Sequence, residues 1–180
     1  MKIKSISVVL AGTILLAALF LSACSGEPEK DYSADSAYAA IFTEEDGEQE
    51  KELKNVLLAH LDAYNNRDAQ AYYALFDMEK EDFNFNVAQL QNIWNAYHIT
   101  YTPESIETAF INEDNAQALI TMTCRGEDAA TGEVLYYYRT ELTYTLVRDG
   151  DWYVSQQQNS GEYDLMDTLE SGAVTETAAE

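Results

Sequence analysis

Two kinds of side chain in this sequence could take part in acid–base chemistry: the two histidines and the thirteen tyrosines. An imidazole can accept a proton near neutral pH, and a phenol can donate a hydrogen bond to a carbonyl oxygen. His60 lies on the apolar stripe of an expected helix, which makes it a weak candidate for a general base. A buried histidine with only a structural role is the commoner explanation for such a position. His98 falls at an expected helix-to-strand junction.

Other chemical patterns are missing from the sequence. It has no Gly-rich phosphate loop, no His and carboxylate spacing for zinc, no calcium-binding loop and no nucleophile elbow. We therefore expect no metal and no cofactor. Cys124 lies in an alternating apolar pattern, which indicates a small buried side chain rather than a nucleophile.

The first 24 residues are typical of an export signal. Lys2 and Lys4 precede an uncharged apolar run over residues 6–21, and the small residues Ser22 and Ala23 then lead to Cys24. The alternative is a transmembrane helix, but such a helix needs roughly 20 apolar residues, more than this run provides.

The four residues Leu21, Ser22, Ala23 and Cys24 resemble a bacterial lipobox. This resemblance implies that residues 1–23 are a removable signal peptide and that Cys24 carries a diacylglycerol. Acyl chains of that kind anchor a protein stably to a bilayer. We therefore expect a lipid-anchored protein on the extracytoplasmic face of a bacterial cell membrane, and the sequence leaves open whether the host has one membrane or two.

The net charge of −22 limits the choice of partners. Nucleic-acid binding needs clustered Lys and Arg, so we expect no nucleic-acid partner. Flat contact with anionic lipid needs a basic face and is also disfavoured.

The rest of the chain divides into a tether, helices, strands and a tail. Residues 24–46 are polar and acidic, which predicts a flexible tether, with docking of the apolar patch Tyr38–Phe42 as an alternative. Apolar spacings of three and four predict helices over residues 49–65, 68–76 and 86–97. The β-prone segments are residues 99–111, 116–125, 133–148 and 152–158, with a tight turn at Asp149-Gly150. Residues 159–180 are predicted to be a disordered acidic tail, apart from a helical turn near DLMDTLE.

This order of elements predicts one α+β domain over residues 47–158. Its opening, VLLAHLDAYNNRDAQAYYALFD, and its close, TYTLVRDGDWYVSQ, resemble the nuclear transport factor 2-like superfamily, which includes SnoaL-like proteins. The resemblance implies a cone in which three N-terminal helices pack on a curved antiparallel sheet of about four strands. Members of that superfamily include isomerases, dehydratases, association domains and non-catalytic exported proteins, so the fold alone does not assign a function.

Strand alternation assigns side chains to the inside and the outside of the cone. The inward set contains no carboxylate, which weakens the case for a catalytic pair. The expected pocket consists of His60, Tyr64, Trp94, Tyr136, Tyr138, Tyr144, Trp152 and Gln156. The opposite face of the third strand offers an expected interface made of Tyr137, Arg139 and Glu141.

We therefore predict a membrane-tethered, non-catalytic domain that binds a small apolar ligand or a protein partner. One alternative is an isomerase-like or dehydratase-like enzyme that uses His60 and a pocket tyrosine. The other is an assembly module that forms a homodimer through the outer face of the sheet. An open cavity around His60 would favour the enzyme, and a cone packed with aromatic side chains would favour a protein-interaction module.

Overall fold

The computed structural model describes residues 30–76 and 78–173, and the predicted signal peptide with Cys24 lies outside them. The element order is η1 (Tyr32–Ala34), α1 (Glu48–Asn65), α2 (Ala69–Ala74), α3 (Lys80–Ala96), β1 (Tyr97–Asn112), β2 (Asn115–Asp128), β3 (Val134–Asp149), β4 (Asp151–Asp164) and α4 (Met166–Ala173). The compact unit that contains all of these elements begins at Asp31. Within the described ranges, no helix is long and apolar enough to cross a membrane.

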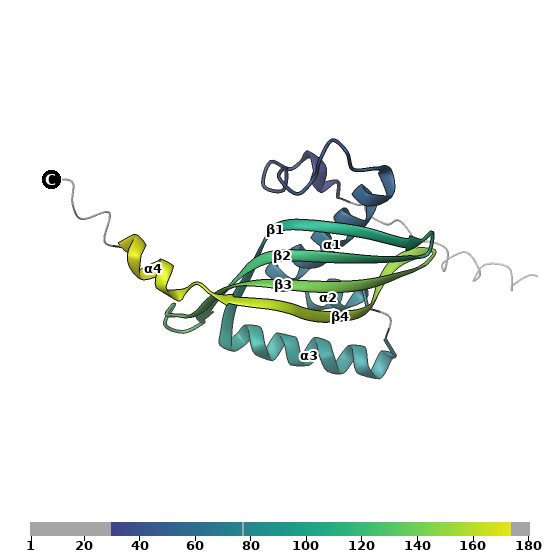
Figure 1. Cartoon of the computed structure of the whole chain (residues 1–180). Helices are drawn as coiled ribbons and strands as arrows, with labels where there is room; N and C mark the ends of the chain where they lie inside the picture. The colour runs from purple at the N-terminus through teal and green to yellow at the C-terminus, as the bar shows by residue number, and fades with distance from the viewer. Residues whose placement is uncertain (1–29, 77, 174–180) are drawn as a thin grey trace, which may run out of the picture. The chain divides into compact units, whose positions relative to one another are not determined.

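The four strands form one antiparallel sheet in the order β1-β2-β3-β4, and α1, α2 and α3 pack on its concave face (Figure 1). Each strand pairs with the next one in sequence, as the predicted meander requires. Gly150, with a φ of 81°, forms the tight turn between β3 and β4, because a glycine has no Cβ to oppose a positive φ. The predicted α+β cone with helices on a four-stranded curved sheet is therefore confirmed.

The main core lies between α1 and the centre of the sheet. Leu53, Leu57 and Leu58 of α1 are fully buried, as are Ile120 and Met122 of β2. The apolar side chains of α1, which are spaced three and four residues apart, form one stripe. This stripe packs against the inward-facing side chains of the strands, which alternate along the chain. This packing fixes the position of His60, one turn further along the same helix.

The segment over residues 31–46 is ordered and corrects the predicted flexible tether. Tyr32 and Ile41 are 3% and 4% exposed, and the Tyr32 and Tyr38 hydroxyls each donate to the Asp62 carboxylate at 3.0 Å. Burial and this carboxylate raise the pKa of Tyr38 to about 12. The docking alternative for Tyr38–Phe42 describes this segment better, because its apolar side chains pack against the core of α1.

Lys54 completes the attachment of this segment. Its ammonium is buried, lies 2.6 Å from the Asp46 carboxylate, and donates to the Ile41 carbonyl oxygen at 2.9 Å. The Phe42 ring lies 5.9 Å from the same ammonium. We call residues 31–46 the strap, because these contacts hold the segment along α1.

Two further boundaries differ from the prediction. The third helix begins at Lys80 rather than residue 86. The half-buried Phe83 packs against the same cluster as Val87, one turn further on, and Glu81 and Asp82 favour a helix N-terminus. The predicted tail is also structured: β4 continues to Asp164 and α4 follows it. β4 keeps pairing because β3 is long enough to offer partners along its whole length, with Arg139 opposite Tyr163.

Candidate functional site

His60 lies inside a box of aromatic rings. Asp68 caps α2 by accepting from the Ala71 N–H at 3.0 Å, and this short helix places the Tyr72 ring over the imidazole. The two rings are stacked with centroids 4.1 Å apart. Phe76 and Tyr144 contact the imidazole edge-on at 5.4 and 5.9 Å, which leaves His60 only 3% exposed. The imidazole is therefore almost completely shielded from solvent by these rings.

The hydrogen bonding of His60 indicates a neutral structural imidazole. Its Nδ1 lies 3.1 Å from the Tyr72 carbonyl oxygen, which can only accept, so Nδ1 carries the proton and donates it. Burial lowers the pKa of His60 to about 4, because the charged form would lose its hydration. Nε2 has no hydrogen-bond partner among the described residues. The predicted base is therefore present in the cone but enclosed.

A second group of aromatic rings fills the cone next to His60. Tyr64 contacts Tyr101 at 4.6 Å and both Trp94 and Tyr72 at 5.2 Å, measured between ring centroids. Tyr64 and Trp94 are 6% and 3% exposed. The predicted pocket residues His60, Tyr64, Trp94 and Tyr144 are thus brought together, but they pack against one another and against neighbouring rings.

Tyr136 and Tyr138 form the exposed rim of the cone. Their rings stack 5.6 Å apart, and Tyr136 lies flat over Gly126 on the neighbouring strand. A Cβ at Gly126 would overlap this ring, so the glycine makes the close approach possible. Both tyrosines are half-buried, and they are the members of the predicted pocket that stay accessible to a ligand.

The sequence interpretation missed two carboxylates on this inner face. Glu162 pairs with Thr140 and Asp164 pairs with Tyr138, so their side chains share the inward face of β3. They were missed because β4 was expected to end at residue 158. Both residues are exposed. They could have been found from the sequence by extending the inward and outward alternation of β3 through the Gly150 turn and along β4.

Trp152 and Gln156 of β4 were both predicted to point into the cone, but only Trp152 is buried. Trp152 is buried next to the β3–β4 turn, where its ring meets Phe110 at 6.1 Å and the Arg148 guanidinium at 5.5 Å. Gln156 was predicted to point inward, which is wrong. A bulge at Ser155 shifts the register so that Gln156 pairs with the outward-facing Thr145.

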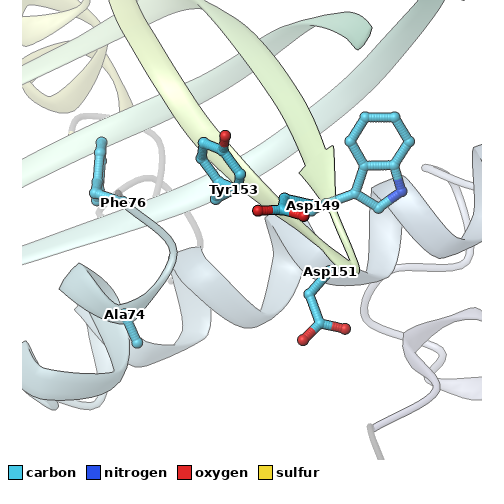
Figure 2. Close-up of a pocket in the computed structure, with 6 residues that line it drawn as sticks. Ala74, Phe76, Asp149, Asp151 and Tyr153 are labelled. Atoms are coloured by element: carbon cyan, nitrogen blue, oxygen red, sulfur yellow. The ribbon is translucent and has the colours of Figure 1, made fainter. Parts of the chain in front are cut away.

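One hollow of about 360 Å³ lies beside Trp152, between the end of α2 and the β3–β4 turn. Figure 2 shows Ala74 and Phe76 on one side of it and Asp149, Asp151 and Tyr153 on the other. The Val154 N–H donates to the Leu75 carbonyl oxygen at 2.7 Å and joins the two sides. Its lining does not include His60.

The predicted interface residues lie on the outer face of the sheet. Arg139 pairs with Glu104 of β1 at 2.8 Å, across the face. Tyr137 lines a groove of about 410 Å³ that also contains Arg125 and Leu169 of α4. The chain's own C-terminal helix therefore borders the outer face at the Tyr137 end.

Comparison with known proteins gives one family and one fold. A family model described as the C-terminal domain of the anti-sigma-I factor RsgI9 matches residues 55–165. No curated protein sequence matches the chain at a significant level.

Similar solved structures share 13% identity with the chain. A provisionally assigned scytalone dehydratase from Novosphingobium aromaticivorans has a TM-score of 0.54, over 65% of this chain and 87% of that one. A hexachlorocyclohexane dehydrochlorinase, LinA-type3, from Novosphingobium barchaimii gives 0.52, over 66% and 90%. A provisionally assigned calcium/calmodulin-dependent protein kinase II association domain from Xanthomonas campestris gives 0.51, over 70% and 94%. At this identity the likeness shows a shared fold and no activity.

Proposed function

Since this chain belongs to the family of the RsgI9 C-terminal domain, we propose that it is a non-catalytic binding module that meets a protein partner outside the cell membrane. The observation that carries the proposal is the filled cone around His60, whose ring is 3% exposed between Tyr72, Phe76 and Tyr144. A general base must come within hydrogen-bond reach of a substrate proton. An enclosed imidazole cannot do so without a large rearrangement.

Two further features support contact with a protein. The family takes its name from an anti-sigma factor, which is a regulator of another protein, and one structural neighbour is an association domain. The lipobox at Cys24 would hold the module near the membrane surface, because the strap begins at Asp31, only seven residues further along the chain.

A small apolar ligand is the second candidate for what the module binds. Tyr136 and Tyr138 favour it, because they offer a stacked, half-exposed aromatic surface on the inner face of the sheet. Such a ligand would lie on the rim and not beside His60. Chemical-shift changes that are confined to these two tyrosines when a small apolar ligand is added would identify binding at the rim.

The test of the filled cone is the response of the thermal midpoint to benzene. We expect benzene to leave the midpoint of the full chain unchanged, whereas a Tyr144→Ala variant should gain a cavity beside His60 and be stabilised by benzene, as engineered apolar cavities are. Tyr144→Phe, which keeps the ring, is the matched control. A benzene-dependent rise in the unaltered chain would show an open cone and favour the enzyme alternative over the binding module.

A further inference from the structure

The hollow beside Trp152 combines negative charge with aromatic walls. It has a volume of about 360 Å³, and its lining includes two carboxylates and two further rings, those of Asp149, Asp151, Phe76 and Tyr153 (Figure 2). Pockets that hold small organic groups start at about 300 Å³. The hollow is therefore large enough for an organic group, and its lining favours one that is positively charged and also packs against rings.

The two carboxylates of the hollow have no counter-charge in the chain. Asp149 ends β3 and Asp151 begins β4, and the two are paired directly across Gly150. Like charges in such a pair repel each other. In the described part of the chain neither carboxylate forms a hydrogen bond or an ion pair, and the neighbouring Arg148 donates instead to Glu52 at 3.0 Å. A cation from another molecule would offset this repulsion.

The walls of the hollow are fixed by contacts within the chain. The Val154 N–H donates to the Leu75 carbonyl oxygen at 2.7 Å, which ties the end of α2 to β4. The Phe76 ring also packs against His60, with 5.4 Å between the ring centroids, and Tyr153 is half-buried on β4. Because the walls are already ordered, a ligand would lose little free energy in ordering them.

We propose that this hollow receives an arginine side chain of the protein partner. A guanidinium is planar, so it can stack on the ring of Phe76 or Tyr153, and its fork of N–H donors can serve carboxylates on both sides of the turn. The chain makes a contact of this kind in the same region, where the Arg148 guanidinium lies 5.5 Å from the Trp152 ring centroid. The net charge of −22 would attract a basic partner from a longer distance.

Three other cations fit the hollow less well. Lysine carries a compact ammonium, which neither stacks as a plane nor binds carboxylates as a fork. The choline group of a lipid has no N–H, so it would leave Asp149 and Asp151 without hydrogen bonds. For a metal ion, residues 30–76 and 78–173 contain no group of three suitable His, Cys, Asp or Glu side chains. The inference rests on the proposed function, because it names what the protein partner presents to the module.

The first test is an NMR titration of the full chain, held in a nonionic detergent, with Nα-acetyl-arginine amide. Signals of Phe76, Gly150 and Tyr153 should shift with a dissociation constant in the millimolar range, as expected for one side chain. The citrulline counterpart has nearly the same shape without the charge and should cause no shift. Absence of shifts in the hollow, or equal shifts with citrulline, would overturn the proposal. Equal binding of lysine amide or choline would overturn the choice of arginine.

Paired variants test the charge and the ring separately. Asp149→Asn should weaken binding of the arginine amide roughly threefold or more, whereas Asp167→Asn, which removes the same charge from an exposed position on α4, should leave it unchanged. Tyr153→Leu should also weaken binding, because it removes a ring that a guanidinium can stack on. Tyr163→Leu is its control, since Tyr163 lies on the same strand and is 55% exposed. Equal effects within either pair would contradict binding in the hollow.

The titration and the benzene test have independent outcomes. Arginine amide that shifts only Tyr136 and Tyr138 would place the cation at the rim and overturn the assignment to the hollow, but it would leave the filled cone untouched. A benzene-dependent rise in the thermal midpoint of the unaltered chain would overturn the proposed function, whatever the arginine amide does.

Discussion

Replacement of His60 by asparagine should remove a defined part of the pH dependence of stability. The asparagine amide can take over donation to the Tyr72 carbonyl oxygen, which Nδ1 of His60 approaches at 3.1 Å, but it cannot be protonated. The pKa of His60 is lowered from 6.5 to about 4 by burial. The unfolded chain therefore binds a proton between pH 6.5 and pH 4 that the folded chain excludes.

The sign and the size of the effect follow from this difference. Because the unfolded state binds more protons in this window, the free energy of unfolding rises with pH. The His60 contribution is complete above pH 6.5 and falls as pH decreases towards 4. For a pKa difference of 6.5 against about 4, the loss is about 2 kcal/mol between pH 7 and 5 and about 3 kcal/mol by pH 4. The phenols of Tyr72 and Tyr144, which face the imidazole, stay neutral throughout, because burial raises the pKa of both.

The assay is urea unfolding of the full chain and of His60→Asn at pH 7, 6, 5 and 4. Protonation of the many carboxylates changes both proteins equally, so the difference between their unfolding free energies isolates the imidazole. His98→Asn is the control, because His98 is exposed. A difference that stays constant from pH 7 to 4 would refute the enclosed, neutral His60, and so would an equal pH effect of His98→Asn.

Two other variants test the strap and the anchor. Lys54→Met should destabilise the chain by about 1–3 kcal/mol and speed amide exchange over residues 31–46, because it removes the 2.6 Å partner of the partly buried Asp46 carboxylate. Lys80→Met should do neither, since Lys80 is exposed. Exchange of the strap that stays slow in Lys54→Met would contradict its attachment through Lys54. Cys24→Ser should abolish incorporation of labelled palmitate and release the protein from the membrane fraction, while labelling that persists in this variant would rule out lipidation at Cys24.

Sequence patterns predict the helices and strands that bury one face, but they do not predict segments that are exposed to solvent on both faces. The stripe Leu53, Leu57 and His60 defines α1, and the alternation through Tyr144 and Leu146 defines the inner face of β3. Segment Gln156–Gly161 of β4 has no buried residue, so its composition is that of a loop even though β3 provides it with a pairing partner. Edge strands of this kind are set by the neighbouring strand and not by their own pattern.

The strap illustrates a second limit of sequence patterns. Its composition is acidic and polar, as expected for a disordered tether, and its large apolar side chains are Tyr32, Tyr38, Ile41 and Phe42. What orders it is a set of specific partners: a carboxylate at Asp62 that accepts from two hydroxyls, and one buried ammonium at Lys54. Such pairings join residues up to thirty positions apart, so no local window of sequence contains them.

The difference between a filled and an open cone comes down to α2. The expected pocket residues are present and converge, yet the cone is closed around His60 because Tyr72 and Phe76 lie one turn apart and both reach the imidazole. The cap at Asp68 fixes the direction of that short helix, and the bridge from Phe76 to Val154 fixes its end on the sheet. Identification of the side chains that line a cone is therefore not enough to assign chemistry to it. The position of the short second helix decides whether those side chains face a ligand or one another. In this chain α2 packs Tyr72 and Phe76 against His60, so the predicted pocket residues form part of the core.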